Sequence, residues 1–136
     1  MKFILLIPLF FIFFTENSNN LKCSDFKTGK FELVNSETNR KYIIERNSEF
    51  QTEETYNLKS GKKISGPRFY KIKWKSDCEY NLLIDTIKSK YDETDLYINS
   101  KGGLNNKILK IENNCATVVT YFEEMNIEAR VYKIQQ

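Results

Sequence analysis

The stretch Tyr70-Lys71-Ile72-Lys73-Trp74-Lys75-Ser76-Asp77-Cys78-Glu79-Tyr80-Asn81-Leu82-Leu83-Ile84 decides the fold. Its first half alternates aromatic or aliphatic residues with lysines, and its second half again places apolar residues at every other position. Successive side chains of a strand point to opposite faces, so each half predicts a half-buried β-strand. The polar residues between the two halves predict a turn.

A turn at Ser76-Asp77-Cys78 fixes how these two strands pair. It sets Trp74 opposite Tyr80 and Ile72 opposite Leu82, so all four side chains share one face. A shift of one residue would turn one apolar set toward solvent. We therefore predict an antiparallel hairpin with Ile72, Trp74, Tyr80 and Leu82 in the core.

The chain on both sides of this hairpin has the same short alternating runs, bounded by Asn, Ser, Gly and Asp. They predict further strands at Phe26–Val34, Arg40–Arg46, Glu49–Asn57, Asn106–Glu112, Ala116–Glu123 and Ile127–Ile134, beside Phe69–Ser76 and Glu79–Asp85 for the hairpin itself. Within Thr86–Leu104 the pattern allows one or two short helical turns. Eight short strands, each joined to the next by a tight connection, predict an all-β, antiparallel up-and-down barrel with little helix.

The N-terminus has the pattern of a secretory signal peptide. Met1 and Lys2 precede an apolar run, Phe3–Phe14, and polar residues follow from Thr15. The run is shorter than the roughly 20 apolar residues that span a bilayer. We expect residues 1–18 to be removed by a cut somewhere in 15–22, which leaves 19–136 as a single domain without a transmembrane segment.

A lipid anchor on Cys23 is the alternative fate of this N-terminus. Lipidation needs a small residue directly before the cysteine, but Lys22 stands there and the apolar run ends at Phe14. We therefore expect an exported monomer that is periplasmic or secreted, with a lipid-anchored envelope protein as the alternative.

Composition excludes several classes of function. The chain has no histidine, which removes Ser-His and Cys-His catalysis and His-ligated zinc, and its three cysteines cannot form a four-cysteine site. We expect no metal, no cofactor and no enzymatic activity. The net charge of +3 is spread among interspersed acids and bases, unlike the one-sided footprint of a nucleic-acid binder.

A polar row on the inner face is the candidate binding site. A three-residue loop at Asn47-Ser48-Glu49 sets Tyr42 opposite Glu54, and the apolar face of the next hairpin sets Glu54 opposite Tyr70. This row either contacts a ligand or forms a structural network at the barrel mouth. A third reading is that the register is displaced by one residue, which would turn Glu54 to the other face.

The cysteines Cys23, Cys78 and Cys115 allow three different single bridges, and their spacing does not choose among them. A resemblance does. The segments Cys23-Ser24-Asp25-Phe26-Lys27-Thr28-Gly29 and Trp74-Lys75-Ser76-Asp77-Cys78-Glu79-Tyr80 resemble two segments of a group of small exported, lipocalin-like β-barrel proteins of Bacteroidetes, which have no settled activity.

The resemblance implies a Cys23–Cys78 disulfide with Cys115 as a buried free thiol, and a calycin-type barrel. Lipocalins proper carry a Gly-x-Trp near the first strand, where this chain has Gly29-Lys30-Phe31. The sequence thus leads us to expect a barrel that binds a small apolar ligand without catalysis. The alternative is an interaction or inhibitor module that meets another protein, such as an envelope protein, through its barrel-end loops.

Overall fold

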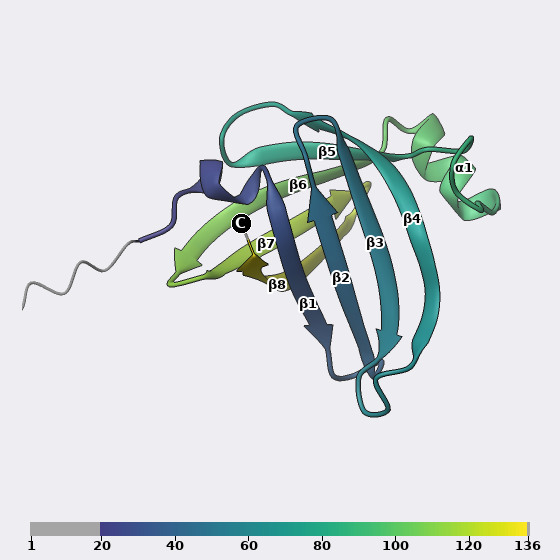
Figure 1. Ribbon diagram of the computed structural model, residues 1–136. Helices are drawn as coiled ribbons and strands as arrows, with labels where there is room; N and C mark the ends of the chain where they lie inside the picture. The colour runs from purple at the N-terminus through teal and green to yellow at the C-terminus, as the bar shows by residue number, and fades with distance from the viewer. Residues whose placement is uncertain (1–19, 136) are drawn as a thin grey trace, which may run out of the picture.

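The computed structural model describes residues 20–135, and the proposed signal peptide lies outside them. The eight strands form one closed antiparallel barrel in sequence order (Figure 1). They are β1 (Gly29–Asn35), β2 (Arg40–Arg46), β3 (Phe50–Asn57), β4 (Lys63–Trp74), β5 (Glu79–Ile84), β6 (Leu104–Glu112), β7 (Cys115–Phe122) and β8 (Met125–Gln135). The predicted all-β, up-and-down barrel is confirmed.

The hairpin that decided the fold pairs as predicted. Trp74 lies opposite Tyr80 and Ile72 opposite Leu82 in the β4–β5 ladder, and the rings of Trp74 and Tyr80 are 4.6 Å apart. Tyr80, Leu82 and Ile72 are buried, whereas Trp74 is partly buried and packs against the core. The fully buried cluster is completed by Phe26, Phe31, Ile44, Ile108, Ala116, Val118 and Val131.

One end of the barrel is closed by the N-terminal segment. The short 3-10 helix η1 (Cys23–Phe26) inserts Phe26, which has no exposed surface, beneath β1. Cys23 forms a disulfide with Cys78 in the β4–β5 turn, as the resemblance implied, and Cys115 is a buried free thiol. The Lys27–Asp77 ion pair, at 2.8 Å, adds a second link between the same two segments.

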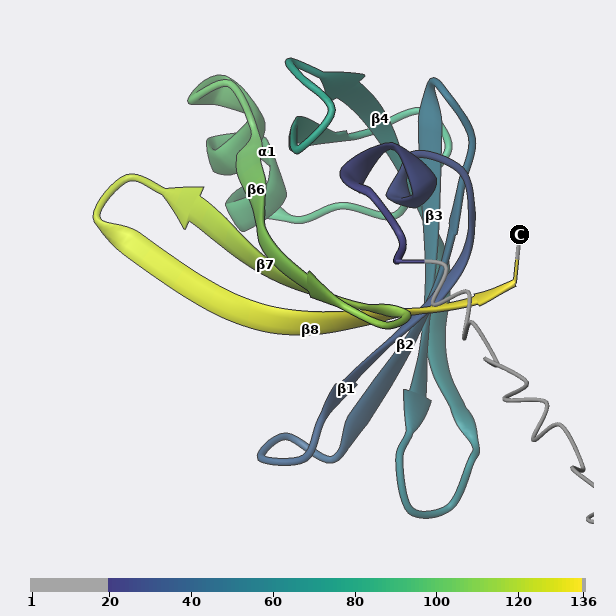
Figure 2. The same cartoon turned by 90° about the vertical axis from the view of Figure 1, so that its left-hand side faces the viewer.

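The other end carries the helix. Asp92 caps α1 (Glu93–Ser100) by accepting a hydrogen bond from the Asp95 backbone, and the Asp95 carboxylate accepts one from the Asp92 backbone in return. The helix lies outside the barrel wall, beside the ends of β4, β5 and β6 (Figures 1 and 2). Among residues 20–135, no helix is both long enough and apolar enough to cross a membrane.

The predicted register of β2 with β3 is wrong by one residue. We expected a three-residue loop, but Asn47 pairs with Phe50 across a two-residue turn, and its side-chain oxygen accepts hydrogen bonds from the Glu49 and Phe50 backbones. Arg46 therefore lies opposite Gln51. A shift of one residue exchanges the two faces of a strand, so Gln51 and Glu53 face inward where Glu54 was expected.

The β3–β4 register also differs, since Tyr70 lies opposite Gln51 and not Glu54. A bulge interrupts this ladder where β4 passes Glu53. Gly66 permits the bulge: it has a φ of +108°, and a Cβ there would lie 2.7 Å from the Glu53 carbonyl oxygen. No other residue type fits this approach without backbone movement.

Candidate binding site in the barrel interior

The predicted row of Tyr42, Glu54 and Tyr70 is not formed. Tyr42 lies opposite Thr55, and Tyr70 lies opposite Gln51. Glu54 is on the outer face, where its carboxylate accepts a 2.5 Å hydrogen bond from the Tyr56 hydroxyl and lies 3.1 Å from the Lys63 ammonium. These two contacts lower the pKa of Glu54. The error has the same cause as the register error, because the two-residue turn at Asn47 reverses the faces of β3.

A different set of polar side chains occupies the interior. Arg46 is 7% exposed, and its guanidinium donates to the Gln51 side-chain oxygen at 2.6 Å, to the Tyr80 hydroxyl at 2.8 Å and to the Phe26 carbonyl at 3.1 Å. The Arg46 guanidinium also lies 5.1 Å from the Phe31 ring centre and 4.6 Å from that of Tyr80. Arg46 thus joins η1, β3 and β5 at the closed end.

Gln51 extends this hydrogen-bond network to Glu53. Its side-chain nitrogen donates to the Glu53 carboxylate at 2.7 Å. Burial raises the pKa of the Glu53 carboxyl above its ordinary value of 4.5, while Gln51 and the charges of Arg46 and Arg68 act in the opposite direction. Burial also raises the pKa of Tyr70, next to Glu53. Perturbed pKa values occur at functional sites and also in structural ion-pair networks.

Arg68 connects this interior network to α1. It lies opposite Glu53 in the β3–β4 ladder, and its guanidinium donates to the Asp95 carboxylate at 2.5 Å. The buried Nε of Arg68 has no hydrogen-bond partner among the described residues. The guanidinium lies 5.6 Å from the Tyr70 ring centre. Arg68 therefore holds an unused donor beside an aromatic ring.

A cavity of about 190 Å³ lies where these groups meet the helix. Its polar wall is formed by Arg68, Tyr70 and Asp95 with Asn99, whose side chain is held by two hydrogen bonds to the Ile84 backbone. Its apolar wall is formed by Leu82, Ile84, Ile98 and Leu104. An apolar wall that faces a few fixed polar groups is the usual composition of a small-molecule site.

The inner faces of β7 and β8 end in exposed apolar residues. Val131 and Ala129 alternate along the inner face of β8, opposite Ala116 and Val118. The same face continues to Ile127 and Met125, each of which is 55% exposed. Tyr97 of α1 lies at the same end, with its ring edge-on to Phe122 at 6.0 Å and its hydroxyl 2.6 Å from Glu123. Apolar side chains thus line an exposed rim.

Of the three predicted site residues only Tyr70 lines the cavity, and the sequence did not lead us to expect Glu53, Arg68 or Asp95 here. The Asn47-Ser48 pair was the one available signal, because Asn is favoured where a side chain completes a tight turn. A two-residue turn there would have turned Glu53 inward. The contact between Arg68 and Asp95 spans 27 residues and follows from the placement of α1, which the pattern of Thr86–Leu104 did not define.

Comparisons with known proteins add no relative. No family model matches the chain, and neither a curated protein nor a solved structure is significantly similar to it.

Replacing Glu53 with Gln should change how stability depends on pH. Below pH 4.5 the carboxyl is protonated in the folded and unfolded states alike. As the pH rises, the unfolded chain ionises first, so the wild type loses stability until the pH passes the raised pKa of the folded carboxyl. The Gln variant keeps an acceptor for Gln51 and lacks this loss.

We therefore expect Glu53→Gln to melt at a higher temperature than the wild type at pH 7, with the difference shrinking toward pH 4. Melting curves at several pH values measure this. The outer-face variant Glu54→Gln is the control, and its difference from the wild type should have the opposite sign, since the pKa of Glu54 is lowered. Parallel profiles for the wild type and Glu53→Gln would contradict the burial of an ionisable Glu53.

Proposed function

We propose that the protein is a non-enzymatic binding barrel that takes a small, largely apolar ligand at the end that carries α1. The cavity between Arg68, Tyr70 and the apolar wall of Leu82, Ile84, Ile98 and Leu104 carries this proposal. Its volume fits one ring or a short branched chain, and the rest of such a ligand would lie against the exposed rim at Ile127 and Met125.

The polar wall defines which group the ligand presents. The Arg68 Nε is a buried donor without a partner, and a buried donor is costly to leave unpaired. Asp95 and Glu53 already accept hydrogen bonds from Arg68 and Gln51. A ligand with one acceptor, such as a carbonyl, hydroxyl or carboxylate oxygen, can accept a hydrogen bond from the Arg68 Nε. A ligand with a cationic group cannot.

Two further parts of the proposal rest on the sequence together with the disulfide. The absence of histidine favours binding over catalysis. The signal-like N-terminus and the Cys23–Cys78 disulfide favour an exported protein, because disulfides persist in oxidising compartments. The alternative of a protein-interaction module is favoured by one observation, the exposed apolar rim of Tyr97, Met125 and Ile127.

The test is a titration with 1-anilinonaphthalene-8-sulfonate, an apolar fluorophore with one anionic group. We expect saturable binding to the wild type that Leu104→Trp, which fills the cavity, weakens at least tenfold. Leu109→Trp is the matched control, because Leu109 is 51% exposed on the neighbouring part of β6. Equal binding by both variants, with melting temperatures near the wild type, would place the fluorophore outside the cavity and leave the interaction module as the better function.

A further inference from the structure

A second hollow lies on the outside of the barrel. It is an open groove of about 740 Å³ between one edge of β4 and the segment that leads into α1. The β4 wall runs from Ile64 to Phe69, and the opposite wall consists of Lys88, Lys90, Tyr91 and Asp92. Arg68 and Asp95 line both this groove and the interior cavity, so their ion pair lies between the two.

The groove exists because β4 is longer than its partner. The β4–β5 ladder runs from Trp74 to Tyr70 and ends at Phe69, whose carbonyl accepts a hydrogen bond from the Asp85 backbone. The Ser89 hydroxyl then caps Phe69, accepting from its N–H at 2.6 Å and donating to its carbonyl at 3.1 Å. The preceding half of β4 pairs with β3 alone, so its other edge is free.

Pro67 limits what this free edge can do. Proline has no backbone N–H, so a ladder along the edge is interrupted at its centre. Edge strands with proline and lysine resist uncontrolled pairing with other chains. An extended segment can lie along this edge, but side chains must provide most of its affinity and specificity.

The charged side chains of the groove differ in whether they already bond to other groups of the protein. Both carboxylates are used within the protein: Asp92 caps α1, and Asp95 accepts from Arg68 and from the Asp92 backbone. Lys88 and Lys90 form no ion pair with any described residue, and the Lys88 ammonium lies 4.7 Å from the Phe50 ring centre. Lys88 and Lys90 are therefore cations without an ion-pair partner, whereas the Asp92 carboxylate, which also forms no ion pair, is held by the backbone at the start of α1.

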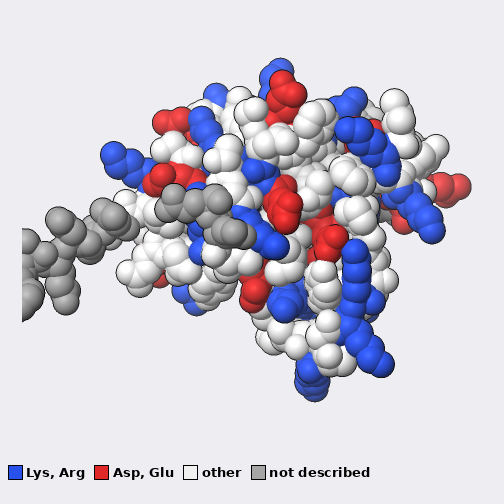
Figure 3. All heavy atoms as spheres, in the orientation of Figure 1, with Lys and Arg blue, Asp and Glu red and all other residues white. Residues whose placement is uncertain are grey.

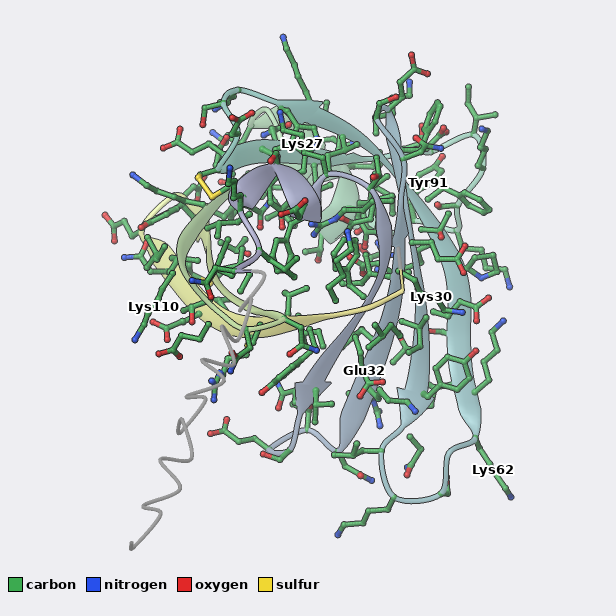
Figure 4. All side chains as sticks on the ribbon, turned by 60° about the vertical axis from the view of Figure 1, so that its left-hand side comes forward. Lys27, Lys30, Glu32, Lys62, Tyr91 and Lys110 are labelled. Atoms are coloured by element: carbon green, nitrogen blue, oxygen red, sulfur yellow. A yellow bond between two sulfur atoms is a disulfide. The ribbon has the colours of Figure 1, made fainter. Side chains whose placement is uncertain are left out.

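Apolar surface lies beside these lysines. Ile64 is 45% exposed and Tyr91 51% exposed, one on each wall of the groove. Figure 4 shows Tyr91 on the outside of the barrel wall, far from Lys62 at the tip of the β3–β4 loop. We propose that this groove binds an extended acidic segment of a partner protein, with carboxylates that contact Lys88 and Lys90 and apolar side chains that contact Ile64 and Tyr91.

Selection from a random octapeptide display library on the immobilised full domain tests the proposal. We expect enriched peptides to combine at least two acidic residues with an aromatic or aliphatic one. The Lys88→Glu/Lys90→Glu double variant should lower affinity for the most enriched peptide at least tenfold in fluorescence polarisation. Lys59→Glu/Lys62→Glu makes the same charge change on the β3–β4 loop and should lower it less than threefold.

Three results would overturn the proposal. They are enrichment without an acidic bias, no enrichment at all, or an equal loss in both double variants, which would indicate attraction by net charge alone. Melting curves confirm that each variant is folded. Binding of the fluorophore to the interior cavity should be unchanged by Lys88→Glu/Lys90→Glu, so failure of this proposal leaves the proposed ligand site standing.

Discussion

Replacing Cys23 and Cys78 together with serine should lower the free energy of unfolding by about 4 kcal/mol. The disulfide joins residues 55 apart in sequence, and in the chain-entropy model closing a loop of this length restricts the unfolded chain by that amount. A small domain has a total stability of roughly 5–15 kcal/mol, so the loss is a large fraction of it. The bond also holds η1, which carries Phe26, against the closed end of the barrel.

Urea unfolding of the double variant and the wild type measures this loss. Cys115→Ala is the matched control, because Cys115 is buried but forms no disulfide, and we expect it to cost about 1 kcal/mol. A double variant within about 1 kcal/mol of the wild type would show that the bridge contributes little. A control variant as unstable as the double variant would point to general sensitivity of the core.

Replacing Arg46 with alanine should cost about 3–5 kcal/mol. The change leaves a void between the rings of Phe31 and Tyr80, and it leaves the Gln51 side-chain oxygen and the Phe26 carbonyl without their donor. A large buried side chain replaced by alanine costs several kcal/mol, and each buried acceptor left unpaired costs roughly 1–3 kcal/mol.

Arg46→Lys separates charge from geometry. Lysine keeps the positive charge but lacks the planar fork that serves three acceptors, so we expect an intermediate loss. Arg130→Ala removes an exposed arginine on β8 and should change stability by less than about 0.5 kcal/mol. Chemical denaturation measures all three variants. A loss below about 1 kcal/mol in Arg46→Ala would mean that Arg46 does not organise the closed end.

The sequence predicted the fold well because most strands carry a strong local signal. Arg40–Arg46 was predicted with the bounds that β2 has, and the pairing of Trp74 with Tyr80 followed from two apolar faces that agree. The Cys23–Cys78 bridge came from a resemblance and not from spacing. Local pattern and pairing suffice when apolar residues alternate strictly along both partners.

The candidate site was harder to predict because polar residues on β3 carry no such pattern. Gln51, Thr52, Glu53 and Glu54 are all polar, so nothing in their order tells the inner from the outer face. The Asn47 side chain decides the register, since it closes the turn over two residues. The bulge at Gly66 then changes the pairing with β4, which no alternation reveals.

Figure 3 shows lysine and arginine side chains at the tip where the β1–β2 and β3–β4 hairpins end, and others interspersed with acidic side chains over the rest of this face. The Asn39 carbonyl accepts from the Leu58 backbone at 3.1 Å and joins the two loops. The Lys59→Glu/Lys62→Glu variant, which is the control for the groove, changes two lysines of the β3–β4 loop at this tip.

Native mass spectrometry tests the central claim, that the barrel interior holds a small molecule, most directly. The wild type and Leu104→Trp are purified side by side, without denaturation, from cells that make the protein naturally. We predict that the wild type carries a small molecule which is released on collisional activation, and that Leu104→Trp, folded and with its disulfide intact, does not. A wild type that carries no adduct and binds no apolar probe, or an adduct retained equally by the cavity-filled variant, would contradict the account.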